Sequence, residues 1–97
     1  MLPRDEHSAV VDDVNGVMII FGGFQEGSRT NETIIYNMRN NVWTTVKIAE
    51  GARKPSSRSG HSAVLHQNIM YIFGGKTDNS VKLNDIWALN LQTLTWN

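Results

Sequence analysis

The chain has 97 residues, and its nine basic and nine acidic side chains give a formal net charge of zero. This balance excludes the strongly basic surface that binds nucleic acid or anionic membranes, and no apolar run is long enough to span a bilayer. The chain has no cysteine, which excludes disulfides, thiolate metal ligands and cysteine nucleophiles. Its polar start lacks the apolar stretch of a signal peptide, so we expect a cytoplasmic protein.

The first half of the chain predicts four short strands and no helix longer than one turn. The strands are expected at residues 7–12, 17–21, 32–36 and 42–48, each bounded by polar residues and turn formers. Residues 13–16, which include Asn15-Gly16, predict the first turn, and residues 37–41 predict the last. Short strands joined in this way predict an antiparallel meander.

The second half predicts a similar series, with strands at residues 60–66, 69–73 and 84–89 and a further strand from residue 94. Gln67 and Asn68 between the first two strands are typical of a two-residue hairpin turn. The run at 69–73 is apolar throughout, which favours a strand buried on both faces. Gly74-Gly75 ends it, since a glycine pair permits positive φ angles or a close backbone approach.

The two halves are copies of one pattern. His-Ser-Ala-Val begins at His7 and again at His61, and Phe-Gly-Gly begins at Phe21 and again at Phe73. The offset is 54 residues for the histidines but 52 for the phenylalanines, so the first copy has two extra residues between these two motifs. They are expected in the turn between two strands, because an insertion within a strand would reverse the faces of the side chains that follow. A repeat of this length means that the copies must stack to bury their faces, as the blades of a β-propeller do.

Four separated elements of the second copy resemble the kelch repeat: Arg-Ser-Gly-His-Ser-Ala-Val at 58–64, Tyr-Ile-Phe-Gly-Gly at 71–75, Asn-Asp-Ile-Trp at 84–87, and Trp96. The resemblance covers practically the whole chain, as two tandem repeats. It implies an all-β fold of two four-stranded antiparallel blades of a kelch-type β-propeller. Blade 1 would span residues 1–49, an inter-blade linker 50–57, and blade 2, with a truncated last strand, 58–97.

Two blades cannot close a ring, and kelch propellers usually have five to seven. We therefore expect the chain to be an excerpt of a larger propeller, with further blades in the same protein. The alternative is a homo-oligomeric ring closed by head-to-tail contacts between copies. An isolated two-blade piece exposes two blade faces, so we expect it to be marginally stable or to associate.

The resemblance also implies which residues hold the blades together. The first strand of each blade would line the central channel and the fourth would lie outermost, with aromatic side chains packed between blades. Tyr36 fits the aromatic position of the third strand in the first copy, whereas the second copy has Leu89 there. Trp87, two residues earlier, is expected to supply the aromatic side chain that Leu89 lacks. The structural motif residues are His7, Gly22, Gly23, Tyr36, Trp43, His61, Gly74, Gly75, Trp87 and Trp96.

The candidates for chemistry are few. His7 and His61 could be metal ligands or bases, but their equivalent positions in both copies favour a structural role. The glycine-rich stretch 22–28 lacks the lysine and the helix of a phosphate-binding loop. The nearby acids are expected to be solvated turn residues: Asp5, Glu6, Asp12 and Asp13. We therefore predict no catalytic residue, no metal site and no cofactor.

The loops after the second and fourth strands of a meander share one face, and loops on a rigid scaffold often carry binding residues. Arg4 and Arg58 would lie at the channel mouth, where a guanidinium could bind a carboxylate or phosphate of a partner. The alternative is that these arginines form salt bridges that tie the blades together. The predicted partner-binding residues are Arg4, Gln25, Arg29, Arg53, Lys54, Arg58, Lys76, Asp78 and Lys82.

These observations predict a non-catalytic protein–protein interaction scaffold that binds partners through loops on one face and binds neither nucleic acid nor membrane. The alternative is the propeller domain of a kelch-type enzyme, sugar-acting or isomerising, whose catalytic groups lie on blades outside this chain. Ser56 and Ser57 are either a phosphorylation site or part of a polar linker, and Asn31 begins a glycosylation sequon. The sequence leaves open the identity of the partner, the number of blades and a role as ubiquitin-ligase adaptor.

Overall fold

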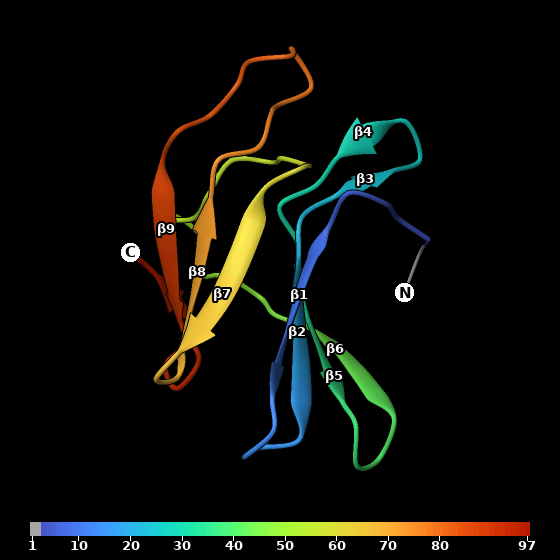
Figure 1. Cartoon of the computed structure of the whole chain (residues 1–97), viewed down its shortest axis with the longest axis vertical. Helices are drawn as coiled ribbons and strands as arrows, with labels where there is room; N and C mark the ends of the chain where they lie inside the picture. Colours follow the sequence, from blue (N-terminus) through green and yellow to red (C-terminus); the bar gives the residue numbers. More distant parts are fainter. Residues whose placement is uncertain (1–2) are drawn as a thin grey trace.

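The structure is a computed structural model that describes residues 3–97, so the first two residues of the predicted blade 1 lie outside it. The described residues form ten β-strands and no helix. The strands make two four-stranded antiparallel sheets and one two-stranded sheet (Figure 1). The all-β prediction is confirmed. Over residues 3–97 there is thus no helix of the length and hydropathy needed to cross a membrane.

Blade 1 consists of β1 (Ser8–Asp12), β2 (Val17–Phe21), β5 (Thr33–Asn37) and β6 (Val42–Thr45), hydrogen-bonded in the order β1-β2-β5-β6. The first three strands match their predicted ranges within one residue at each end. The predicted strand 42–48 is too long, because β6 ends at Thr45. The backbone N–H of Val46 still donates to the carbonyl of Thr33 at 2.8 Å, and the chain then turns away from the sheet as the connector to blade 2.

Blade 2 repeats the meander with β7 (Ser62–His66), β8 (Ile69–Phe73), β9 (Ile86–Asn90) and β10 (Thr95–Trp96). Gln67 and Asn68 form the predicted two-residue turn, with φ angles of 48° and 68° that suit a hairpin of this length. The predicted strands 60–66 and 84–89 begin two residues too early. At the first of them, Gly60 has a φ of 71°, which is incompatible with an extended strand.

A small hairpin lies in the segment predicted to be a loop. It consists of β3 (Phe24–Gln25) and β4 (Ser28–Arg29), joined by Glu26 and Gly27 with φ angles of 50° and 86°. Strands of two residues are too short to show the alternation from which a sequence pattern can be recognised. The hairpin is held to the start of blade 1 by a β-bridge between Asp5 and Phe24.

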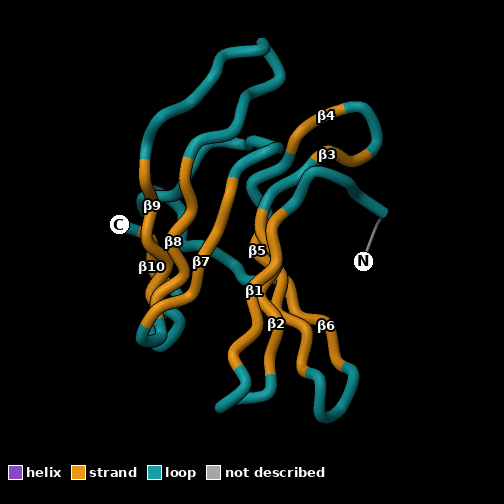
Figure 2. The backbone as a smooth tube through the Cα atoms, in the orientation of Figure 1, coloured by secondary structure: helices purple, strands orange, loops and turns teal. Residues whose placement is uncertain are grey.

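The two blades meet through β1 and β7, which run side by side in the centre of Figure 1. Figure 2 shows the strands of the two blades as two groups joined by the connector from β6 to β7, with the β3–β4 hairpin apart from both. A single apolar cluster spans the junction. Its buried members are Val10, Ile19 and Phe21 from blade 1, and Met70, Ile72, Leu89 and Trp96 from blade 2.

Only some of the aromatic side chains expected between the blades lie in the junction of the two blades. Phe21 lies edge-on to Trp96, with ring centroids 5.1 Å apart, and Trp96 in turn lies edge-on to Trp87 at 6.4 Å. Trp87 thus supplies bulk on the face where it was expected. Trp43 and Phe73, however, are 46% and 50% exposed, because each lies on the side of its blade that no other blade covers.

Candidate functional site

Three segments from different parts of the chain meet at one end of the molecule, the upper end in Figure 1. They are the β3–β4 hairpin, the loop between β8 and β9, and the end of the connector before β7. The backbone N–H of Arg58 donates to Thr30 at 3.2 Å, and the side-chain amide of Asn31 donates to the carbonyl of Pro55 at 3.1 Å. We call residues 24–31, 55–60 and 76–83 the loop face.

Arg29 ties together the loops of the two blades. Its backbone N–H donates to the carboxylate of Asp78 at 2.8 Å, and its Nε donates to Oγ of Ser59 at 2.7 Å. Its guanidinium lies over the ring of Phe24, 5.2 Å from the centroid, and 3.5 Å from the same carboxylate. Arg29 and Asp78 were both predicted to contact a partner, and the structure shows them bound to each other. Their separation of 49 residues left no sequence pattern that could reveal this pair.

Other predicted residues of the loop face remain accessible. Lys76 and Lys82 are exposed, and with Glu6 they line a shallow hollow of about 350 Å³. Gln25 is half-buried, and its Oε1 is a buried atom without a hydrogen-bond partner among the described residues, so a partner protein cannot reach that oxygen. Lys76 and Lys82 are therefore the part of the predicted surface that is free to bind a partner.

Arg4 and Arg58 make equivalent ion pairs in the two blades. The two terminal nitrogens of Arg58 lie 2.6 and 3.0 Å from the carboxylate oxygens of Asp85, and Nη2 of Arg4 lies 2.8 Å from Oε1 of Glu32. Both arginine side chains are only 1% exposed. The pairs lie within each blade and do not tie one blade to the other. Glu32 and Asp85 recur 53 residues apart, which is the repeat signal that could have identified them as partners.

His61 joins the two blades at the buried junction. Its Nε2 lies 2.8 Å from Oγ of Ser8, and its ring lies edge-on to Phe21 with centroids 5.3 Å apart. Its Nδ1 is buried and has no hydrogen-bond partner within the described part of the chain. Burial lowers the pKa of His61, and the positive charge of Arg58 lowers it further. A neutral imidazole in this position suits a structural role, whereas the equivalent His7 is exposed.

The free energy of unfolding should therefore fall in two separate steps as the pH is lowered. The folded-state pKa of His61 lies below its ordinary value of 6.5, so its contribution is present above that pH and is lost below it. Hydrogen bonds from Arg58 lower the pKa of Asp85 from 3.8 to about 2, so its contribution is lost across that lower range.

Denaturant unfolding at a series of pH values measures both steps. His61→Gln, which keeps a group able to hydrogen-bond to Ser8, should abolish the step below pH 6.5. Asp85→Asn should reduce the acid step without abolishing it, because hydrogen bonds from Asn15 also lower the pKa of Asp12. A near-neutral step that survived in His61→Gln would contradict the assignment.

Arg53 and Lys54 lie apart from the rest of the predicted surface. The guanidinium of Arg53 lies over the ring of Trp87, 5.2 Å from its centroid, at the outer strands of blade 2. The connector reaches this point by running beside β10, where Ile48 and Trp96 help to line a groove of about 330 Å³. The connector was expected to lie on the loop face, but only its end does so, because its first half packs against the side of blade 2.

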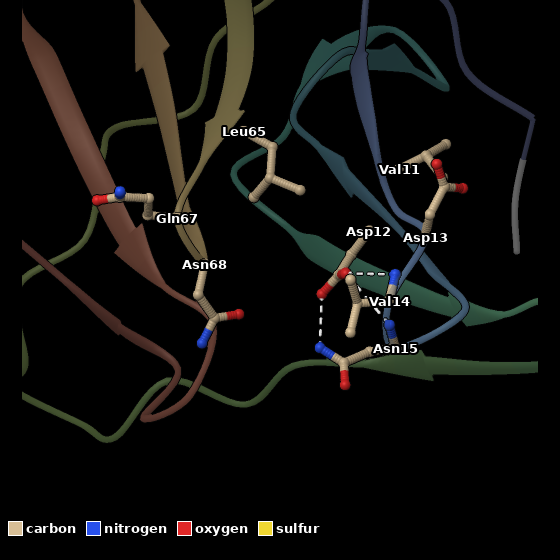
Figure 3. Close-up of a pocket in the computed structure, with 8 residues that line it drawn as sticks. All are labelled: Val11, Asp12, Asp13, Val14, Asn15, Leu65, Gln67 and Asn68. Carbon is tan, nitrogen blue, oxygen red and sulfur yellow. Dashed lines mark hydrogen bonds between the residues drawn. The ribbon is translucent and has the colours of Figure 1, made fainter.

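A hollow of about 510 Å³ lies at the opposite end of the molecule, between the β1–β2 and β7–β8 turns (Figure 3). Val11, Val14 and Leu65 form its apolar walls. The carboxylate of Asp12 accepts hydrogen bonds of 2.7–3.2 Å from Val14 and Asn15, so this acid serves to hold the turn. Within residues 3–97 no three acidic or histidine side chains are grouped in a way that could hold a metal ion.

Comparison with known proteins agrees with the fold of two four-stranded blades. The KLHDC2/KLHL20/DRC7 Kelch-repeats domain matches residues 1–97. The chain is 35% identical over 96 residues to the leucine-zipper-like transcriptional regulator 1 homolog of Drosophila melanogaster, covering 92% of this chain and 9% of that protein. It is 33% identical over 99 residues to Kelch domain-containing protein 10 of Homo sapiens, covering 98% of this chain and 22% of that protein.

A solved structure, that of YjhT, shares the fold. It superposes with a TM-score of 0.82 at 17% sequence identity, covering 98% of this chain and 37% of that one. The chain thus spans about a tenth and about a fifth of the length of the two relatives named above, and 37% of YjhT. The chain belongs to the kelch-repeat family, and its two four-stranded sheets are blades of the kelch propeller type.

Proposed function

We propose that this chain is a non-catalytic protein-interaction module that binds a partner protein through the loop face. The observation that carries the proposal is the clamp from Arg29 to Asp78 and Ser59, which fixes the loops of two blades against each other. A surface that is already ordered loses little conformational entropy on binding, so its contacts contribute more fully to affinity. The rigid sheets below the loops hold them in place.

The exposed side chains indicate what kind of surface the partner offers. Lys76 and Lys82 are exposed and line the hollow of about 350 Å³. Ammonium groups pair with carboxylates as point charges. A partner segment with acidic side chains therefore fits this surface best.

The combined variant Lys76→Ala/Lys82→Ala is expected to weaken partner binding about tenfold, because it removes both lysine side chains that line the hollow. Proteins retained from cell extract on the immobilised chain are identified by mass spectrometry, and the affinity of each purified partner is then measured by calorimetry. Lys47→Ala is the matched control, since Lys47 is an exposed lysine outside the loop face. Unchanged affinity of the double variant for every partner, with its circular dichroism intact, would show the proposal to be wrong.

A further inference from the structure

The connector between β6 and β7 carries two basic residues shortly before a pair of serines. Arg53 and Lys54 are exposed and precede Ser56 and Ser57, with the fully buried Pro55 between them. Ser56 is exposed, whereas Ser57 is half-buried. The connector runs from blade 1 to blade 2, and the structure describes both, so the exposure of Ser56 is measured at a junction that has formed.

The backbone around Ser56 is open to an enzyme that binds its substrate as an extended segment. Residues 52–56 belong to no strand or turn. Within residues 53–57, the backbone groups hydrogen-bonded in the described part of the chain are the carbonyls of Pro55 and Ser56, and both bonds come from side chains. Local opening of the connector therefore exposes this segment without unfolding either sheet.

The spacing of the basic residues suits a base-directed protein kinase. The substrate groove of such an enzyme is acidic, and a guanidinium three residues before the acceptor serine can bind its carboxylates through two parallel hydrogen bonds. Arg53 holds that position for Ser56, whereas Ser57 has Lys54 there. Arg53 lies over the ring of Trp87, and the stronger contact with carboxylates can replace this exposed cation–π contact.

Arg58 offers a binding place for a phosphate on Ser56. Its guanidinium uses all of its N–H groups. Nε donates to the carbonyl of Ser56 at 3.1 Å, Nη1 to the carbonyl of Gly74 at 3.1 Å and to Asp85 at 2.6 Å, and Nη2 to Asp85 at 3.0 Å and to Oγ of Ser56 at 3.2 Å. A phosphate oxygen on Ser56 can take the last of these N–H groups in place of Oγ, and the other bonds remain. A hydrogen bond to a charged oxygen is about twice as strong as one to a neutral oxygen.

The charges near Ser56 favour an anion there. Arg58 contacts Ser56 directly, and Arg53 and Lys54 lie within three residues of it along the chain. The carboxylate of Asp85 opposes a second anion, but it is already paired with Arg58. A phosphate placed beside arginines forms new charge-assisted hydrogen bonds and orders the segment that carries it.

We propose that Ser56 is a phosphorylation site for a base-directed protein kinase and that the attached phosphate binds Arg58. The kinase transfers the γ-phosphoryl group of ATP: the bond from Oγ of Ser56 to phosphorus forms, the bond to the β-phosphate breaks, the hydroxyl proton is released and ADP leaves. The backbone of Arg58 also contacts blade 1 through Gly23 at 2.9 Å and Thr30 at 3.2 Å. The phosphate would thus stabilise the point where the blades join. The inference rests on the connector and does not depend on partner binding at the loop face.

The first test is phosphorylation of the purified chain by the catalytic subunit of the cyclic-AMP-dependent protein kinase, a base-directed enzyme, with Mg²⁺ and ATP. Tandem mass spectrometry should place the phosphate on Ser56, so Ser56→Ala should abolish incorporation and Ser57→Ala should leave it unchanged. Arg53→Ala should lower kcat/KM about tenfold, because it removes the guanidinium that the kinase binds. Lys47→Ala is the matched control, since Lys47 is an exposed cation earlier in the connector. A Ser56 that stays unmodified, or a rate that Arg53→Ala leaves unchanged, would overturn the proposal.

The second test detects the contact with Arg58. The second pKa of a phosphoserine is about 6, and a neighbouring guanidinium should lower it by about one unit in the folded chain. Phosphorus NMR of the phosphorylated chain over a series of pH values measures this pKa. The same titration in urea, with the chain unfolded, is the control and should return the pKa to about 6. Equal pKa values in the folded and unfolded chain would show that the phosphate does not bind Arg58.

Discussion

Phe21→Ala is expected to lower the free energy of unfolding by about 3–5 kcal/mol. Phe21 is fully buried at the junction, with its ring edge-on to both His61 and Trp96 at centroid distances of 5.3 and 5.1 Å. Its removal leaves a cavity lined by both blades. The lost transfer free energy of the ring and the cost of that cavity therefore add.

Phe73→Ala is the matched control for this prediction. Phe73 holds the same motif position in blade 2 but is 50% exposed, so its removal should cost no more than about 1 kcal/mol in the monomer. Urea unfolding monitored by tryptophan fluorescence gives both values, at a protein concentration low enough to keep the chain monomeric. Equal losses for the two variants would mean that the junction does not form in solution as the structure shows it.

Gly22→Ala is expected to cost about 2–5 kcal/mol, for two separate reasons. Gly22 has a φ of 68°, a conformation that alanine adopts only with strain. A β-carbon there would also lie 2.7 Å from Cε1 of His61 and 2.9 Å from the carbonyl oxygen of Arg58. The second contact is with backbone, so the two blades would have to move apart to relieve it.

Gly74→Ala separates these two costs. Gly74 has nearly the same φ, 71°, but the nearest atom to an added β-carbon is the carbonyl oxygen of Leu83 at 3.2 Å. This variant carries the backbone strain and only a mild contact, so it should cost about 1–2 kcal/mol. Denaturant unfolding gives the free energy of unfolding of each glycine variant. The difference between the two values measures the cost of the close contact between the blades at Gly22. Indistinguishable values would argue against the close contact at Gly22.

The side chains that the sequence offered as candidates for binding or catalysis instead make contacts that stabilise the fold. His61 lies between the blades beside Ser8, and Asp12 holds the first turn of blade 1. Arg4 and Arg58 are buried in ion pairs within their own blades. None of these four side chains is therefore part of the surface proposed to bind a partner. That surface is formed by Lys76 and Lys82, which lie on the loop that Arg29 binds through Asp78.

Local patterns predicted most of the fold because they act over a few residues. The apolar run 69–73 became β8 with the predicted bounds, and the Gln67-Asn68 turn formed where hairpin chemistry placed it. The errors occur where a contact between distant segments decides the conformation. The β3–β4 hairpin and the early end of β6 are such cases, since both depend on neighbours outside the local run.

The repeat by itself determined the all-β meander, the two blades and the family, because spaced motif residues report the local backbone and the faces that must be buried. Only the tertiary structure decided which copy of each motif residue is buried. Phe21 and Trp96 lie at the junction while Phe73 and Trp43 lie exposed, although the sequence presents each pair as equivalent. It also decided that Arg29 binds Asp78 across 49 residues. A repeated sequence specifies identical faces, whereas burial depends on which of those faces has a neighbour in space.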